Sequence, residues 1–151
     1  MNQEFMPSAL ELIKKYEGFS AKPYLCPAGV WTIGYGNTKY PNGIRVGKND
    51  PSISEKEALQ MLSFTVEKEF LPKVLELSPI LKQHPNKLAA ILSFCYNLGA
   101  GAYANSTLRK KVNASQFEQA SKEFSKWVMA SGKKLNGLVK RRAEEAELFM
   151  R

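Results

Sequence analysis

The segment SALELIKKYEGFSAKPYLCPAGVWTIGYGNT, residues 8–38, decides the fold that we predict for this chain of 151 residues. Its first part contains an S-x-x-E capping box, Ser8 and Glu11, followed by apolar residues at helical spacing. This pattern predicts a helix from about Ser8 to Glu17. The second part is rich in Gly, Pro and Tyr, and turn signals flank the β-prone residues 30–33. A small antiparallel sheet of two or three strands is therefore predicted directly after the first helix.

The remainder of the chain has the patterning of helices separated by Pro and Gly. The predicted helices span residues 55–69, 86–98, 106–112, 116–130 and 137–149. The fold class expected is α+β, mostly helical, with the small antiparallel sheet after the first helix. A chain of this length accommodates one ordinary domain, so residues 1–151 are predicted to form a single domain. Within it, a β-rich subregion covers about residues 18–50 and a helical subregion covers residues 54–150.

The composition is that of a folded, basic protein. Lys and Arg number 22 against 14 Asp and Glu, and 44% of residues are apolar, which excludes disordered and low-complexity material. Residues 109–142 hold ten basic and two acidic residues, so this segment alone accounts for the net charge of +8 of the whole chain. A basic face in this C-terminal part is therefore expected to meet an anionic partner.

No run of residues approaches the roughly 20 apolar positions that a membrane-spanning helix needs, so stable membrane insertion is not expected. The first 15 residues lack the apolar core of a signal peptide, which predicts a cytoplasmic location after synthesis. The two cysteines lie far apart without CxxC spacing, and His84 is the single histidine. We therefore expect no metal site and no cofactor.

Glu17 is the acidic residue whose position in the sequence best suits a catalytic role. It lies in the apolar stripe at the end of the first predicted helix, whereas most other glutamates lie on surface-like helical positions beside lysines. Partial burial favours the protonated form of a carboxyl group, which is the form that a general acid needs. The alternative is a helix-end glutamate whose carboxylate lies in water.

Several short motifs in a fixed order make the chain similar to a known family. They are EGF at 17–19, KPY at 22–24, GVWTIGYGNT at 29–38, FCYNLG at 94–99, NSTL at 105–108 and GLVKRR at 137–142, followed by Glu145. Together they resemble the phage-type lysozymes, the endolysins of glycoside hydrolase family 24. The resemblance extends over about residues 8–149.

The resemblance implies an active site with the order glutamate, eight residues, aspartate or sometimes cysteine, five residues, threonine. Glu17, Cys26 and Thr32 match this spacing. By resemblance, Glu17 protonates the glycosidic oxygen of the β-1,4 linkage between N-acetylmuramic acid and N-acetylglucosamine in peptidoglycan. Thr32 then helps to hold the attacking water, and the middle residue activates that water or stabilises the oxocarbenium-like transition state.

Cysteine in place of the usual aspartate changes the charge at the middle position. An ordinary thiol, with a pKa of about 8.5, is mostly uncharged at pH 7. Nearby cations could lower the pKa of Cys26, the thiol could act through its polarisability and position, or Cys26 could be dispensable. Two structural alternatives are a small apolar filler and a disulfide with Cys95.

Three further residues match positions near the sugar cleft of the family: Tyr96, Asn97 and Ser106. An aromatic face beside amide and hydroxyl groups suits acetamido sugars, although packing or helix capping would explain each residue equally well. Arg141 and Arg142 precede an apolar helical stripe, so one of them is expected to turn inward and pair with an acid of the cleft.

The function predicted is therefore a muramidase that lyses the host cell by cutting peptidoglycan glycan strands. The basic face would bind anionic cell-envelope polymers, and the protein is expected to be a monomer. By resemblance to the family, it would accumulate in the host cytoplasm and reach the cell wall, in the periplasm, through a separate pore-forming protein. One alternative is a lytic transglycosylase that cuts the same bond. A basic nucleic-acid-binding protein is another, although no nucleic-acid-binding motif accompanies the charge.

Overall fold

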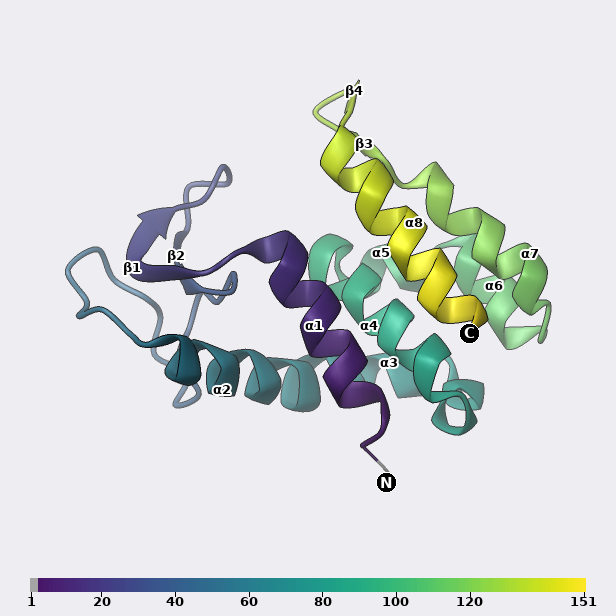
Figure 1. Ribbon diagram of the computed structural model, residues 1–151, viewed down its shortest axis with the longest axis horizontal. Coiled ribbons are helices and arrows are strands. Elements are labelled where there is room, and N and C mark those ends of the chain that lie inside the picture. Colours follow the sequence, from purple (N-terminus) through teal and green to yellow (C-terminus); the bar gives the residue numbers. More distant parts are fainter. Residues whose placement is uncertain (1–2) are drawn as a thin grey trace.

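The computed structural model describes residues 3–151 and consists of a β-containing lobe beside a larger group of helices (Figure 1). The chain starts with α1 (Phe5–Glu17), which runs towards the β-containing lobe. The sheet follows directly, with β1 (Ser20–Leu25) antiparallel to β2 (Trp31–Gly34). The prediction of a helix followed by a small antiparallel sheet is thus confirmed.

Helix α1 begins earlier than predicted. The residue at its N-cap is Glu4, and the expected capping box at Ser8 is not formed. The reason lies in the residues before Ser8, since Phe5 and Met6 are both buried in the core. Burying these apolar side chains extends the helix by three residues at its start, which outweighs the local capping signal.

The helical part contains most of the remaining elements. They are α2 (Glu55–Thr65), the π-helical turn η1 (Val66–Phe70), α3 (Leu71–Leu77), the 3-10 turn η2 (Pro79–Gln83), α4 (Pro85–Leu98), α5 (Ala100–Ala104), α6 (Thr107–Asn113), α7 (Phe117–Glu123), the 3-10 turn η3 (Phe124–Lys126) and α8 (Asn136–Met150). Helix α2 begins with an S-x-x-E capping box, in which the side chains of Ser54 and Glu57 each accept a hydrogen bond from the other residue's backbone N–H.

Two predicted helix ends are wrong. The helix expected over residues 55–69 continues past Pro72, because the wider turn of η1 lies just before the proline and leads into α3. The helix expected over residues 116–130 ends at Lys126. It is followed by a short hairpin of β3 (Met129–Ala130) and β4 (Lys133–Lys134), which projects from the body in Figure 1.

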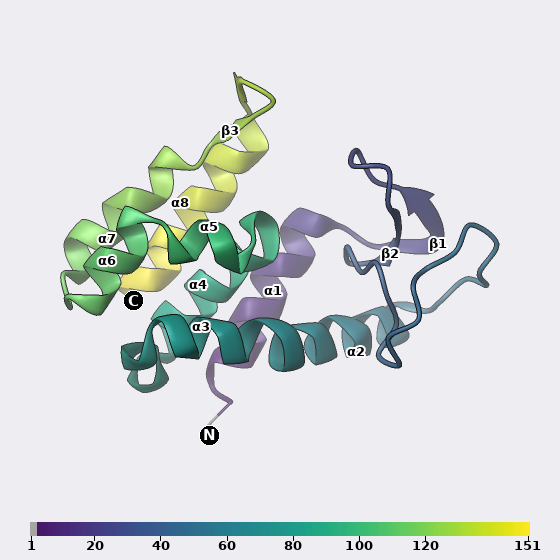
Figure 2. The ribbon, with the colours of Figure 1, turned by 180° about the vertical axis from the view of Figure 1, so that it is seen from behind.

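Helix α4 forms the centre of the core. Its residues 88–95 are all buried, and it packs against α1 and α8, as the reverse view also shows (Figure 2). A smaller apolar cluster of Ile33, Val46 and Met61 joins the sheet to α2. The end of α1 therefore lies where the sheet, α4 and α8 meet.

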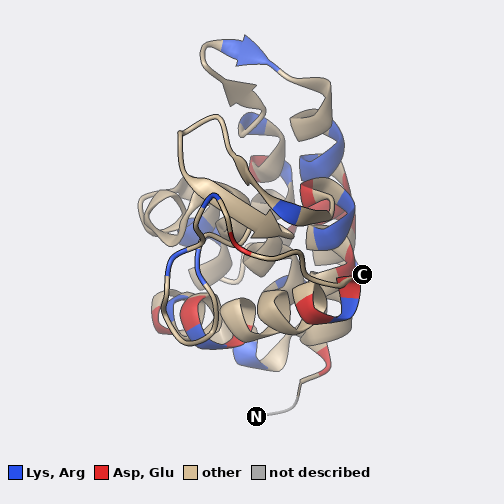
Figure 3. Ribbon diagram, turned by 90° about the vertical axis from the view of Figure 1, so that its left-hand side faces the viewer, with Lys and Arg blue, Asp and Glu red and all other residues tan. Residues whose placement is uncertain are grey.

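The basic residues of the C-terminal part do not all reach the surface. Arg141 and Arg142 are buried, and Arg109 donates hydrogen bonds to backbone carbonyls of Leu77 and Ala104. The charge on this face is carried by lysines, including those of β4 (Figure 3). Among residues 3–151, no helix is both long and apolar enough to cross a membrane.

Candidate active site

A hollow of about 220 Å³ lies between the sheet-bearing lobe and α4. Its lining residues are Glu17, Gly36, Asn37, Thr38, Lys39, Thr65, Glu69, Phe70, Tyr96 and Asn97. Three of the predicted site residues, Glu17, Tyr96 and Asn97, are thus brought together. A larger hollow of about 720 Å³, between residues 40–53 and α2, is lined by none of the predicted site residues.

Glu17 is the last residue of α1. Gly18 follows it with φ +73, a left-handed conformation that ends the helix at this point. The Glu17 side chain is 23% exposed, and its Oε2 accepts a hydrogen bond of 2.7 Å from Nη1 of Arg141. The expectation that one arginine turns inward to an acid of the cleft is confirmed for Arg141.

A buried network of charges supports this arrangement from α8. The carboxylate of Glu145 lies between Arg141 and Arg142, at 3.3 Å and 2.7 Å respectively, and also accepts a hydrogen bond from Ser93. Burial raises the pKa of Glu145, although Arg142 and Ser93 act against that shift. Nη2 of Arg142 donates to Oδ1 of Asn97 at 2.9 Å, which orients the amide that lines the hollow. No role of Glu145 was expected from the sequence, in which it only follows the GLVKRR motif.

Gly36 and Tyr96 lie beside the Glu17 carboxyl group in this hollow. The hydroxyl of Tyr96 donates a 2.7 Å hydrogen bond to the backbone carbonyl of Tyr35, and burial raises the pKa of this phenol. A Cβ atom built on Gly36 would lie 3.0 Å from Oε1 of Glu17 and 3.5 Å from the Tyr96 hydroxyl. A side chain at position 36 would therefore crowd the Glu17 carboxyl group.

Cys26 and Thr32 belong to the β1–β2 hairpin and are not among the residues that line the hollow. Cys26 is partly exposed. Its pKa is lowered mainly by a hydrogen bond from the backbone N–H of Val30, with further contributions from Ala28 and Thr32. The largest contribution to the lowered pKa of Cys26 thus comes from a backbone N–H group and not from nearby cations, which were one of the possibilities considered from the sequence.

The other interpretations of Cys26 are also tested by the structure. Both cysteines are free, so the disulfide alternative is wrong. Cys95 is buried on α4, and burial raises its pKa to about 12. Partial exposure also argues against Cys26 as a buried filler.

Thr32 and Ser106 have hydrogen-bond partners within the protein. Thr32 is 3% exposed, and its hydroxyl donates to the Val30 carbonyl at 2.9 Å. Ser106 is the N-cap of α6; its hydroxyl accepts from the backbone N–H of Arg109 and donates to the Tyr103 carbonyl. Ser106 lies outside the residues that line the hollow, so the capping interpretation explains it.

No group of three or more His, Cys, Asp or Glu side chains within residues 3–151 is arranged to hold a metal ion. The chemistry that the described site offers is that of a carboxyl group held by a guanidinium, next to aromatic, amide and hydroxyl groups. Such a site is suited to acid catalysis on a polar substrate.

The chain is similar to known proteins over most of its length. The endolysin of Acyrthosiphon pisum secondary endosymbiont phage 1 is 38% identical over 144 residues, which cover 93% of each chain. An endolysin structure from Escherichia coli O157:H7 phage FAHEc1 superposes with a TM-score of 0.82 at 30% identity, over 99% of this chain and 94% of that one. The muramidase domain of SpmX from Asticaccaulis excentricus also gives a TM-score of 0.82, at 26% identity and 99% coverage of both chains. Residues 14–145 match the model of the phage lysozyme family, and the chain belongs to that family.

Proposed function

We propose that the protein is a muramidase of glycoside hydrolase family 24 that hydrolyses the β-1,4 bond between N-acetylmuramic acid and N-acetylglucosamine. As a phage lysozyme, it is a glycoside hydrolase that acts on peptidoglycan. The observation that carries the finer proposal is the position of Glu17. Its carboxyl group is partly buried, lines a hollow and is held by Arg141.

The two oxygens of Glu17 have different surroundings, which suits a general acid. Oε2 is engaged by the guanidinium of Arg141, whereas Oε1 lies on the side of Gly36 and Tyr96. In the proposed reaction Oε1 carries the proton and transfers it to the glycosidic oxygen as the bond breaks. Arg141 keeps the carboxyl group in place during this transfer.

Cys26 and Thr32 are proposed to act on the opposite face of the sugar. The lowered pKa of Cys26 increases the fraction of thiolate, which supplies negative charge where the family usually has aspartate. With Thr32 beside it, this group would hold and activate the attacking water. Tyr96 and Asn97, which line the same hollow as Glu17, are proposed to bind the sugar.

We also propose where the protein acts. The protein would be a monomer that accumulates in the host cytoplasm and acts on the cell wall after release. The exposed lysines of the C-terminal part would attract anionic envelope polymers such as those that carry phosphate or carboxylate groups.

Analysis of the ends formed during digestion of purified peptidoglycan tests this function. Attack by a water held opposite Glu17 predicts new reducing N-acetylmuramic acid ends with α configuration, the inverted product. Formation of 1,6-anhydro ends would mean that no water attacks, and a transglycosylase would then replace the hydrolase.

A further inference from the structure

The β1–β2 hairpin places a third side chain, that of Tyr24, near Cys26 and Thr32. Tyr24 is the direct cross-strand partner of Thr32, so their side chains leave the sheet on the same face. Tyr24 and Cys26 are two positions apart, a spacing that also places side chains on one face of an extended chain. This face of the hairpin therefore carries Tyr24, Cys26 and Thr32 together.

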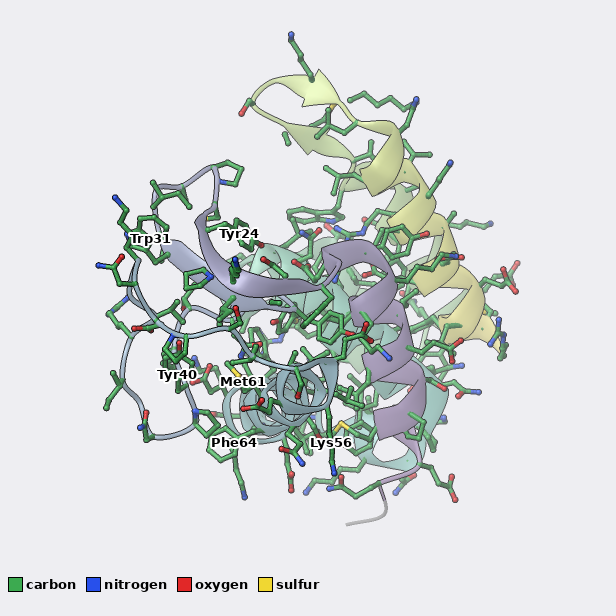
Figure 4. All side chains as sticks on the ribbon, turned by 60° about the vertical axis from the view of Figure 1, so that its left-hand side comes forward. Tyr24, Trp31, Tyr40, Lys56, Met61 and Phe64 are labelled. Atoms are coloured by element: carbon green, nitrogen blue, oxygen red, sulfur yellow. The ribbon has the colours of Figure 1, made fainter. Side chains whose placement is uncertain are left out.

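The neighbouring pair Leu25 and Trp31 occupies the opposite face of the sheet. Trp31 packs against the small apolar cluster that joins the sheet to α2. Figure 4 shows Tyr24 on the side of the sheet that faces the helices, and Trp31 on the other side. Tyr24 nevertheless stays accessible, since 38% of it is exposed.

The electrostatic surroundings of Tyr24 agree with this placement. Burial contributes most to the raised pKa of its phenol, and the negative charges of Glu17 and Cys26 contribute further. Tyr24 in turn affects the pKa of Tyr96. The phenol thus lies within electrostatic reach of the general acid, the thiol and the aromatic wall of the hollow.

Tyr24 also differs from the other hydroxyl groups of the site in its hydrogen bonding. The Thr32 hydroxyl is engaged by the Val30 carbonyl and by Cys26, and the proton of Tyr96 is used by the Tyr35 carbonyl. Within the described part of the chain, the Tyr24 hydroxyl has no such acceptor. The thiolate form of Cys26 only accepts hydrogen bonds, and in the proposed reaction the proton of Glu17 goes to the glycosidic oxygen, so Tyr24 supplies a further donor for the sugar.

We propose that Tyr24 is a substrate-binding residue whose ring contacts a sugar of the glycan strand and whose hydroxyl donates a hydrogen bond to an oxygen of that sugar. The inference rests on the proposed function, because it assumes that the glycan lies between Glu17 and the hairpin. Sugar hydroxyl and acetamido carbonyl oxygens are the acceptors that such a donor fits.

Binding is best measured without turnover, in a Glu17→Gln background. The probe is a soluble tetrasaccharide of two N-acetylglucosamine–N-acetylmuramic acid repeats, titrated by calorimetry into this variant and into double variants. Adding Tyr24→Phe removes only the donor and is expected to raise Kd by about 3- to 10-fold, the effect of one hydrogen bond. Adding Tyr24→Ala also removes the ring and should weaken binding further.

The matched control is Leu25→Ala in the same background. Leu25 is the next residue on β1, is 54% exposed and lies on the opposite face, so its truncation should leave Kd unchanged. Thermal unfolding of the Tyr24→Phe variant should match that of its parent. Equal affinity of the Tyr24→Phe variant and its parent, or equal weakening by Leu25→Ala, would overturn the inference.

The outcome for Tyr24 can be separated from the outcome for the muramidase assignment. If Glu17→Gln alone retains lytic activity, the proposed general acid is wrong, whatever the tetrasaccharide titrations give. If Glu17→Gln is inactive and the Tyr24→Phe double variant binds as its parent does, the proposed function stands and the role of Tyr24 is wrong.

Discussion

Nη1 of Arg141 lies 2.7 Å from Oε2 of Glu17, although 124 positions separate the two residues in the chain. Glu17 ends the first helix and Arg141 belongs to the last one, so the proposed catalytic acid is held by a residue from a distant part of the sequence. The same guanidinium also bonds to Glu145 and to Ser93. Correct placement of the acid therefore depends on the packing of α8 against α1 and α4.

Replacing Arg141 by Ala is expected to lower both stability and activity. It removes a buried cation from two carboxylates and leaves Glu145 with less compensation, which costs about 3–5 kcal/mol. Arg141→Lys should recover only part of this loss, because one ammonium group cannot reproduce three separate guanidinium contacts. Urea unfolding measures the change, and Lys140→Ala, at an exposed neighbour, should stay within about 0.5 kcal/mol of wild type. Equal midpoints for Arg141→Ala and Lys140→Ala would contradict the role of the network.

Gly36→Ala is expected to slow the enzyme by crowding Glu17. The new methyl would lie 3.0 Å from Oε1, so the carboxyl group must move slightly, and the loss in rate should stay below the roughly 100-fold that a 1 Å misplacement can cost. Gly43→Ala is the matched control, since Gly43 has the same φ of +87 and nothing within 4 Å of the added atom. Both variants should lose about 1–2 kcal/mol of stability from the left-handed backbone. Similar rates of wall lysis for the two variants would show that crowding at Glu17 has no effect.

Alkylation should distinguish the two cysteines and inhibit the enzyme through Cys26. Because the pKa of Cys26 is lowered, its reaction with iodoacetamide should reach half its limiting rate below the usual thiol pKa of about 8.5. Buried Cys95, with a pKa of about 12, should react only after unfolding. Mass spectrometry then finds one modified cysteine in the native protein. The Cys26→Asp variant should stay active and resist the reagent, whereas full activity of the alkylated wild type would make Cys26 structural.

The lysines of the β3–β4 hairpin are expected to govern attraction to the wall. Lys133→Glu with Lys134→Glu should slow lysis of whole walls at low salt, and the difference should shrink at 0.1 M salt, where the Debye length is about 10 Å. Hydrolysis of a short neutral oligosaccharide should change little. Lys68→Glu with Lys73→Glu alters the net charge equally at exposed positions outside residues 109–142 and is the control. If both pairs slow wall lysis equally, net charge and not the basic face is responsible.

The elements with local signals could be predicted from the sequence, but their ends depended on tertiary packing. Among the S-x-x-E patterns of the sequence, the one at Ser54 caps α2 whereas the one at Ser8 lies inside α1. The difference comes from Phe5 and Met6, whose burial could not be known locally. The β3–β4 hairpin was missed because its strands are only two residues long.

The part of the site that lies in one contiguous segment of the chain could be predicted from the sequence. The spacing of Glu17, Cys26 and Thr32 reflects a helix end followed by a hairpin, and both are formed by neighbouring residues. Arg141, which holds Glu17, comes from α8. The sequence indicated that one of the two arginines, Arg141 or Arg142, turns inward, but it did not indicate which one. Tyr24 carried a usable signal, its two-residue spacing from Cys26, which points to a shared face of the strand.

The most direct test of the central claim is the rate at which Glu17→Gln forms new reducing ends in purified peptidoglycan. The amide keeps the shape of the side chain and lacks the proton that the leaving group needs, and general acid catalysis contributes about 100- to 10,000-fold. The variant should fold as wild type does, judged by circular dichroism, and its rate should fall at least 100-fold. A folded Glu17→Gln protein that retains more than a tenth of the wild-type rate would contradict the assignment of Glu17 as the catalytic acid.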